Sequence, residues 1–266
     1  MASYHTRSFS FPSNSHPVAD QLDAQLCRLR SSQAASTSSL TTKLNGLNDL
    51  YKCVEEFLQL PQNQKTVSQT QGENVVEQVL DGSLRLLDIC STSRDVLALS
   101  KERLQDIQSV LRRRCSGELD ITNEVAEYLK TRKSSKKIIK KCLKDINTVE
   151  KTNESIAIEN MLKDVQAVSI DVFKSLLSYI GESKKSSWSF SKLVRQRAEK
   201  EATTSISEFD VVDATLELIN QKKKVNIEMS QLVNLESEVQ EIDEVLESLF
   251  RHLIKTRSTL LNVLSN

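Results

Sequence analysis

A heptad pattern near the C-terminal end of the chain constrains the fold most strongly. Between residues 225 and 264, apolar side chains recur at alternating spacings of three and four, a pattern that predicts a helix with one continuous apolar seam. Glu228 would place a carboxylate on that seam at a high cost of burial, so we expect tight packing to begin at Leu232. The predicted seam, polar only at Thr256, is Leu232, Leu235, Val239, Ile242, Leu246, Leu249, Leu253, Thr256, Leu260 and Val263.

The charges of this segment also follow one helical direction. Acidic residues gather between 236 and 247 and basic residues between 251 and 257, which complements a helix dipole. Such a helix would be roughly 48 Å long at about 1.5 Å per residue, and its seam needs covering by other helices. Apolar residues beside the seam, such as Met229 and Phe250, widen the face. The width favours a multi-helix bundle, with a homo-oligomeric coiled coil as the competing structure.

Few helix-breaking residues interrupt the chain. It has five glycines and three prolines in 266 residues, with no proline after Pro61 and no strand-like alternation. We therefore predict an all-α fold, an elongated bundle of long antiparallel helices ending in the heptad helix. Residues 17–266 are predicted to form a single domain, behind a disordered serine-rich tail at 1–16. Flexible loops are expected near 31–39, 181–188 and 200–205.

Several helix limits are suggested by local signals. A first helix is expected from Pro17 to Arg30, a second from about residue 40 until just before Pro61, and a third from about 73 to 114. The inner face of the third is predicted to include Leu84. Further helical faces follow at 125–146, 154–180 and from 209 onward. The pair Ser205 and Glu208 predicts a capping box, and Gly181 a helix end.

Charge is balanced overall but concentrated locally. The 36 basic and 36 acidic residues cancel, which argues against a generally basic, nucleic-acid-binding protein. Residues 130–144 nevertheless hold a basic patch without an acidic residue: Lys130, Arg132, Lys133, Lys136, Lys137, Lys140, Lys141 and Lys144. It is either a solvated helix face balanced by the acidic part of the C-terminal helix, or a contact for an anionic membrane or for a protein such as calmodulin. Nucleic acid is disfavoured because aromatic stacking residues are missing nearby.

The N-terminal tail carries a short modification pattern. Arg7, Ser10 and Pro12 form an R-S-x-S-x-P sequence, in which phosphorylated Ser10 would suit the arginine cluster of a 14-3-3 protein. Serine-rich disorder also produces such patterns by chance. The same composition resembles a weak plastid transit peptide.

Catalytic signatures are missing from the sequence. No phosphate-binding glycine loop, HExxH or GxSxG is present, so we expect no catalytic residue, metal or cofactor. Five widely spaced cysteines without a CxxC pair indicate free thiols in a reducing compartment. No apolar run is long enough to span a membrane. We expect a cytoplasmic protein, with the plastid or the membrane periphery as alternatives.

Five stretches carry a family resemblance: LPQNQKTVSQ (60–69), LDGSLRLLDICSTSRD (80–95), LRRR (111–114), SSWSFSKL (186–193) and LESLFRHLIKTRSTLLNVL (246–264). Together they resemble the plant BYPASS-like family, from about Tyr4 to the C-terminus. The resemblance implies an all-helical plant protein without assigned enzymatic activity or catalytic residues. BYPASS itself, a more distant relative, is associated with root and shoot development.

These observations favour a non-enzymatic helical scaffold or regulatory protein that acts through protein–protein contacts. By the family resemblance, such a role would be linked to root and shoot development. A peripheral membrane adaptor that uses residues 130–144 is one alternative. A phosphorylation-dependent 14-3-3 client that uses Ser10 is another. Homo-oligomers remain open as well.

Overall fold

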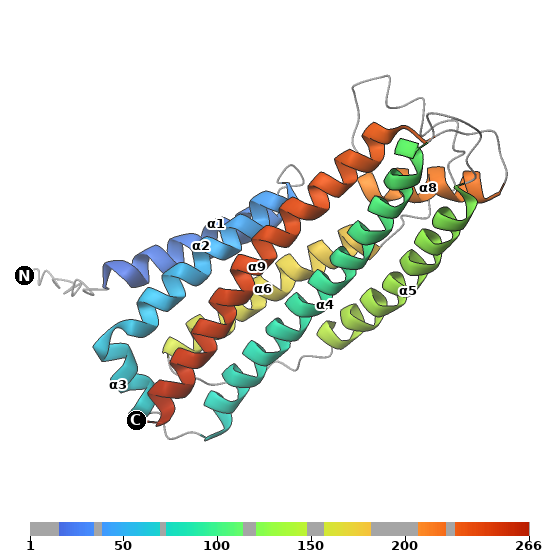
Figure 1. The fold of residues 1–266 in the computed structure, drawn as a ribbon. Helices are drawn as coiled ribbons and strands as arrows, with labels where there is room; N and C mark the ends of the chain where they lie inside the picture. The colour runs from blue at the N-terminus through green and yellow to red at the C-terminus, as the bar shows by residue number, and fades with distance from the viewer. Residues whose placement is uncertain are drawn as a thin grey trace, which may run out of the picture.

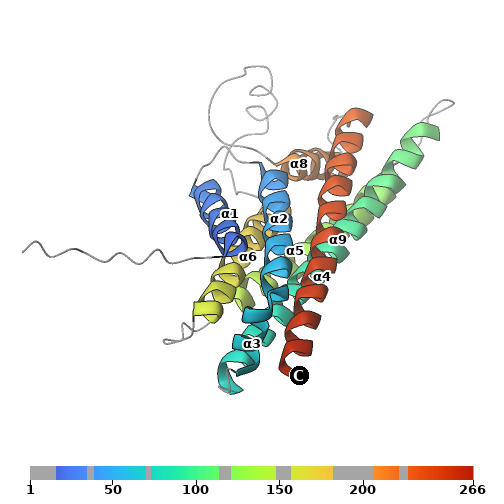
Figure 2. The ribbon, with the colours of Figure 1, turned by 90° about the vertical axis from the view of Figure 1, so that its left-hand side faces the viewer.

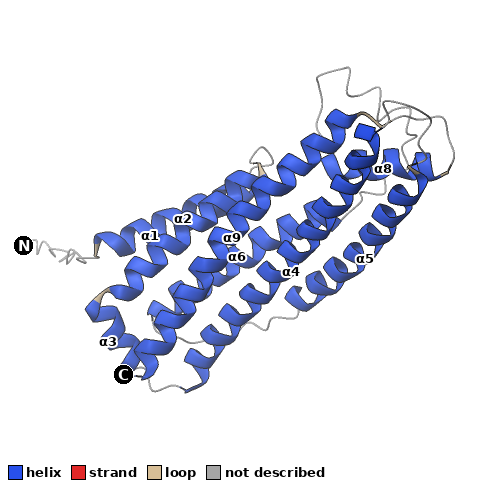
Figure 3. Cartoon of the chain, in the orientation of Figure 1, coloured by secondary structure: helices blue, strands red, loops and turns tan. Residues whose placement is uncertain are grey.

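A computed structural model describes residues 16–34, 39–69, 73–113, 121–147, 157–181, 207–221 and 227–265. Within these ranges the regular secondary structure is entirely α-helical, which confirms the predicted all-α class (Figure 3). The helices are α1 (Pro17–Ala34), α2 (Leu40–Gln59), α3 (Pro61–Gln69), α4 (Glu73–Arg112), α5 (Thr122–Asn147), α6 (Ala157–Gly181), α8 (Glu208–Asn220) and α9 (Met229–Ser265).

Four long helices form the centre of an elongated bundle. Contacts join α2 to α9, α9 to α4, α4 to α6 and α6 back to α2 (Figure 1). The α1 helix packs against α2 and α6 on one flank, and α5 packs against α4 and α6 on the other. Figure 2 shows α3 and α8 at opposite ends of the bundle. The α4 and α9 helices run in opposite directions, whereas α2 and α9 run in the same direction (Figure 1).

The heptad helix α9 lies between α2 and α4. Its buried residues are the ten positions of the predicted seam, from Leu232 to Val263. Polar bonds flank this apolar contact: Arg94 of α4 pairs with Asp243 at 3.0 Å, and Lys101 donates to Gln240 at 2.5 Å. On the other side, Glu55 of α2 accepts bonds from α9. One chain therefore covers the whole seam, without a second copy.

A glycine allows α6 to approach α4 closely. The Gln166 side chain of α6 donates to the carbonyl oxygen of Val79 at 2.7 Å. A Cβ added to Gly82 would lie 2.3 Å from Oε1 of Gln166, so a larger residue would displace this amide. Glycine weakens a helix, but at position 82 it leaves room for a hydrogen bond between α4 and α6.

The α2 helix ends at Gln59, before Pro61 as predicted, and Pro61 begins a further helix, α3, which was not predicted. A proline at the first helical position loses no backbone hydrogen bond. Two other local predictions differ from the structure. The cap of α8 is Ser207 rather than Ser205, since its side chain accepts from the amide of Asp210. The α1 helix continues to Ala34, beyond the predicted end at Arg30.

The predicted inner face of α4 is wrong at Leu84. That side chain is 47% exposed, while Leu86 and Ile89 are buried instead. The reason is that α4 packs against α9, α5 and α6, so its buried surface covers more than one stripe. The predicted loops near 181–188 and 200–205 fall outside the described residues, apart from Gly181, which is the last residue of α6.

Candidate interaction surfaces on α5

The basic patch of residues 130–144 lies on α5 and is divided between two sides of that helix. Arg132 is buried and Lys136 is half-buried, whereas the other six basic side chains are exposed. The patch is therefore not one surface, because two of its members face the bundle.

The inward side of α5 forms an ionic cluster with α8, defined here as Tyr128, Arg132, Lys136 and Asp213. Arg132, only 3% exposed, donates to both carboxylate oxygens of Asp213 at 3.0–3.2 Å. Tyr128 donates to the same carboxylate at 2.9 Å and Lys136 at 2.8 Å. Arg132 also donates to the carbonyl oxygen of Ile180 at 2.8 Å. The cluster thus ties α5, α6 and α8 together.

Electrostatics keep the Asp213 carboxylate ionised and the Tyr128 hydroxyl protonated. Burial by itself raises the pKa of Asp213, but the charges and hydrogen bonds of Arg132 and Lys136 outweigh it, so the pKa is lowered. Burial and the neighbouring Asp213 raise the pKa of Tyr128, which keeps its hydroxyl protonated as a donor. The Arg132 guanidinium lies 4.4 Å from the ring centroid of Phe209, a cation–π contact. These interactions hold the fold together and leave Arg132 unavailable to an external partner.

The outward side of α5 presents what we call the lysine face: Lys130, Lys133, Lys137, Lys140 and Lys144. These exposed residues recur at spacings of three and four, so they follow one line along the helix. Among the described residues, Lys130 pairs with Glu127 at 3.3 Å, and no carboxylate lies within ion-pair distance of the other four. The remaining basic residue, Lys141, is also exposed and borders a groove.

The expectation that acidic residues of the C-terminal helix balance the basic patch needs correction. Asp243 of α9 pairs with Arg94 of α4, and Glu236 accepts bonds from Gln105 and Gln108 of α4 at 2.6 and 2.7 Å. These acidic groups face α4 rather than α5, because α4 lies between the two helices (Figure 1).

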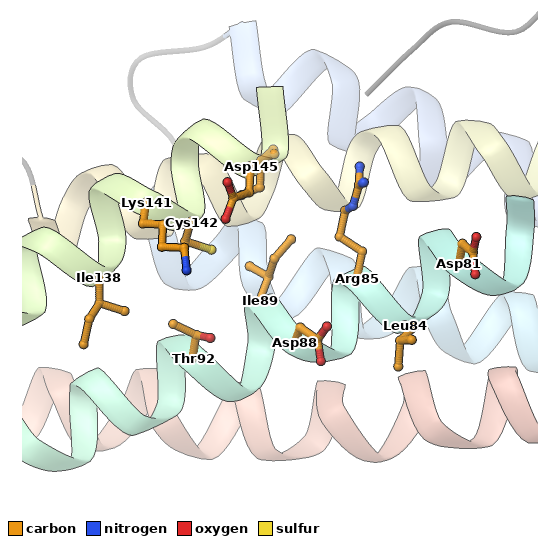
Figure 4. A pocket seen from close by; sticks show the side chains of 11 residues that line it. Asp81, Leu84, Arg85, Asp88, Ile89, Thr92, Ile138, Lys141, Cys142 and Asp145 are labelled. Carbon is orange, nitrogen blue, oxygen red and sulfur yellow. The ribbon is translucent and has the colours of Figure 1, made fainter. Parts of the chain in front are cut away.

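A groove of about 550 Å³ lies between α4 and α5 (Figure 4). Leu84 and Ile138 project from its two sides with 47% and 44% of their surfaces exposed. Figure 4 shows these two apolar side chains toward opposite ends of the groove, with Asp88 of α4 and Lys141 of α5 between them. The lining residues are Asp81, Leu84, Arg85, Asp88, Ile89, Thr92, Ile138, Lys141, Cys142, Asp145 and Ile146.

The comparisons with known proteins place the chain in a family. A family model described as Protein BPS1 matches residues 43–263, which is most of the chain. The chain belongs to the BPS1 family. No curated protein and no solved structure matched it.

The BPS1 match contains every surface described above. Residues 43–263 run from the first turn of α2 almost to the end of α9, so they include the ionic cluster, the lysine face and the α4–α5 groove. Arg7, Ser10 and Pro12, the residues of the predicted 14-3-3 pattern, lie before the matched region and outside the described residues. That hypothesis stays a prediction.

The structure also shows where histidine and other potential metal-binding or reactive side chains lie. His252 lies against Glu55, with Nδ1 2.6 Å from the carboxylate, in a contact between α9 and α2. Among the described residues, no group of His, Cys, Asp and Glu side chains is arranged to hold a metal ion. None of the described helices is both long and apolar enough to cross a membrane.

Sequence reasoning missed Asp213 and the α4–α5 groove. A signal for the first was present, because Tyr128, Arg132 and Lys136 recur every four residues and therefore share one side of a helix. Tyr128 lies within the helical face predicted at 125–146, which makes burial of Arg132 on the same side foreseeable. The groove had no comparable signal, since it depends on how two helices separate in space.

Proposed function

We propose that this BPS1-family protein is a non-enzymatic helical regulator that acts through protein contacts, with the α4–α5 groove as the contact site. The observation that carries the proposal is the pair of exposed apolar side chains, Leu84 and Ile138, that face the same groove from two helices. Exposed apolar side chains that line one groove together with polar groups are typical of a binding site for another protein.

The charges around the groove indicate the chemistry of the partner. Asp81 and Asp88 lie two turns apart on α4 with Arg85 between them, and Lys141 and Asp145 border the groove from α5. An amphipathic helix suits this arrangement if its apolar stripe contacts Leu84 and Ile138, its basic residues lie toward α4 and an acidic residue lies toward Lys141. The occupant is therefore a partner helix of mixed charge.

The use of the buried ionisable groups supports a non-enzymatic role. Asp213 is bonded to Arg132, Lys136 and Tyr128, and Glu55 accepts bonds from His252 at 2.6 Å and Lys255 at 2.5 Å. These groups are engaged in bonds between helices, whereas catalysis needs reactive groups that converge on a substrate. By its family, we further propose that the contacts regulate plant root and shoot development.

Site-specific photo-crosslinking tests the contact site. A photoreactive phenylalanine analogue would replace Leu84 or Ile138 in the full chain, expressed in plant roots, and the adducts would be identified by mass spectrometry. Leu99 is the matched control, because it is an exposed leucine on the same helix, 43% exposed, and does not line the groove.

We expect the same partner to be crosslinked from positions 84 and 138 and not from 99. Replacing Asp81 and Asp88 with lysine should reduce this adduct, since it removes the complementary charge. Equal adducts from all three positions, or none from 84 and 138, would show that the groove is not the contact site.

A further inference from the structure

We propose that the lysine face of α5 docks the protein on the surface of an anionic lipid bilayer. The first support is geometric. The inner side of α5 packs on α4, α6 and α8, so the lysine face points away from the bundle at its outer edge (Figure 1). From Lys130 to Lys144 the line spans roughly 21 Å at about 1.5 Å per residue. A planar surface can therefore meet all five lysines at once.

The charge of this face is local and largely uncompensated. The chain as a whole has a formal net charge of zero, so no general attraction draws it to an anionic surface. In the described part of the chain, four of the five lysines have no carboxylate within ion-pair distance, and only Lys130 has a partner, Glu127. Inside the bundle, Asp213 pairs with both Arg132 and Lys136, so these two cations share one carboxylate. The exposed positive charge of α5 is thus concentrated on this line of side chains, with Lys141 beside it.

The residue types on the face distinguish a lipid surface from other polyanions. Protein interfaces are depleted in lysine and enriched in arginine, methionine and aromatic residues at their centres, the reverse of this face. Single-stranded nucleic acid is bound with aromatic side chains for stacking, and none is present between Lys130 and Lys144. Lysine offers a flexible point charge without fixed geometry, which suits the diffuse negative charge of a fluid bilayer.

Vesicle sedimentation with the full chain tests the proposal. The probes are vesicles of phosphatidylcholine containing phosphatidylserine, and vesicles of phosphatidylcholine alone. One variant replaces four lysines of the face: Lys133→Gln, Lys137→Gln, Lys140→Gln and Lys144→Gln. The matched control removes the same number of positive charges from exposed residues of α1, α2, α3 and α9: Arg28→Gln, Lys52→Gln, Lys65→Gln and Arg251→Gln. Circular dichroism confirms that each variant is folded.

We expect the unmodified chain and the control to bind the vesicles that contain phosphatidylserine, more weakly as salt is added, and not phosphatidylcholine alone. Each lysine near an anionic surface contributes about fivefold, so the lysine-face variant should lose several hundred-fold in partitioning, on the order of 600-fold. Equal losses in the control, or undiminished binding by the lysine-face variant, would overturn the proposal. The proposal would also be overturned if the chain did not bind vesicles but captured a partner protein in a lysine-dependent way.

The test of this proposal and the test of the groove proposal are independent of each other. The lysine-face variant leaves Leu84 and Ile138 unchanged, so crosslinking from the groove should persist in it. Conversely, Ile138→Ala should leave vesicle binding within about twofold, because it removes no charge.

Discussion

Replacing Asp213 with alanine tests how much this carboxylate stabilises the buried charge of Arg132. Asp213 is the common acceptor for Tyr128, Arg132 and Lys136, and it joins α8 to α5. Without it, Arg132 would keep its charge at a site where only 3% of the side chain is exposed. Its remaining bond to the carbonyl oxygen of Ile180 does not neutralise that charge.

The expected magnitude follows from this burial. Removing one partner of a buried ion pair costs about 3–5 kcal/mol, because the other charge stays desolvated. Asp243→Ala is the matched control. It breaks the pair with Arg94 between α4 and α9, in which both side chains are 31% exposed. Loss of a pair with that much solvent access should cost less than about 1 kcal/mol. The two aspartates therefore separate a buried pair from a partly exposed one.

Urea unfolding of the full chain, followed by circular dichroism, measures both costs, and hydrogen exchange in α8 shows whether that helix detaches first. The pH dependence gives a second check through Asp213→Asn. The pKa of Asp213 in the folded chain is lower than its ordinary value of 3.8. The stabilisation that its charge provides is therefore complete above 3.8 and is lost as pH falls through the folded-state pKa. The advantage of the unmodified chain over Asp213→Asn should shrink in that acidic range.

Similar losses for Asp213→Ala and Asp243→Ala would refute the reasoning, as would an advantage of Asp213 over asparagine that grows in acid. Similar losses would mean that Asp213 and Arg132 are hydrated in solution, and the opposite pH trend would mean that burial of Asp213 outweighs the attraction of Arg132 and Lys136.

Three further predictions concern packing and protonation. Leu246→Ala should lower the unfolding free energy by about 2–5 kcal/mol and Glu244→Ala by less than about 0.5, and equal losses in urea unfolding would place the seam in another register. In the native chain a thiol reagent should modify the exposed Cys27 and spare Cys90, because burial raises the pKa of the Cys90 thiol to about 12. Peptide mass spectrometry would detect modification of both cysteines if the α4–α9 contact were loose. Burial raises the pKa of Glu238, so Glu238→Gln should raise the urea midpoint at neutral pH and lose that advantage in acid, whereas an advantage that grows in acid would disagree.

The sequence predicted what depends on local periodicity. The seam of α9 is an example, because its ten positions are set by the 3.6-residue repeat of a single helix and the structure buries each of them. The all-α class follows from the same repeat along the chain together with the scarcity of helix breakers. Both features are properties of neighbours in sequence.

The features that the sequence did not reveal depend on tertiary partners. Arg132 and Lys133 are adjacent basic residues, yet one is buried and the other exposed, because only the first faces Asp213. Asp213 is remote in sequence, so composition alone groups the two basic residues in one patch. Leu84 was predicted to lie in the core because it is apolar. Its apolar character does not show that a groove opens between α4 and α5 beside it.

The division of α5 into a structural side and a binding side is the central claim, and a substitution scan along this helix tests it most directly. Arg132, Lys133, Lys137 and Lys140 would each be replaced by glutamine in the full chain, and the unfolding free energy of each variant measured in urea. Arg132→Gln should lose about 3 kcal/mol or more, because Asp213 would be left buried without its main partner. Each lysine variant should stay within about 0.5 kcal/mol of the unmodified chain. A uniform set of small losses, or a large loss at Lys133 or Lys137, would contradict the claim.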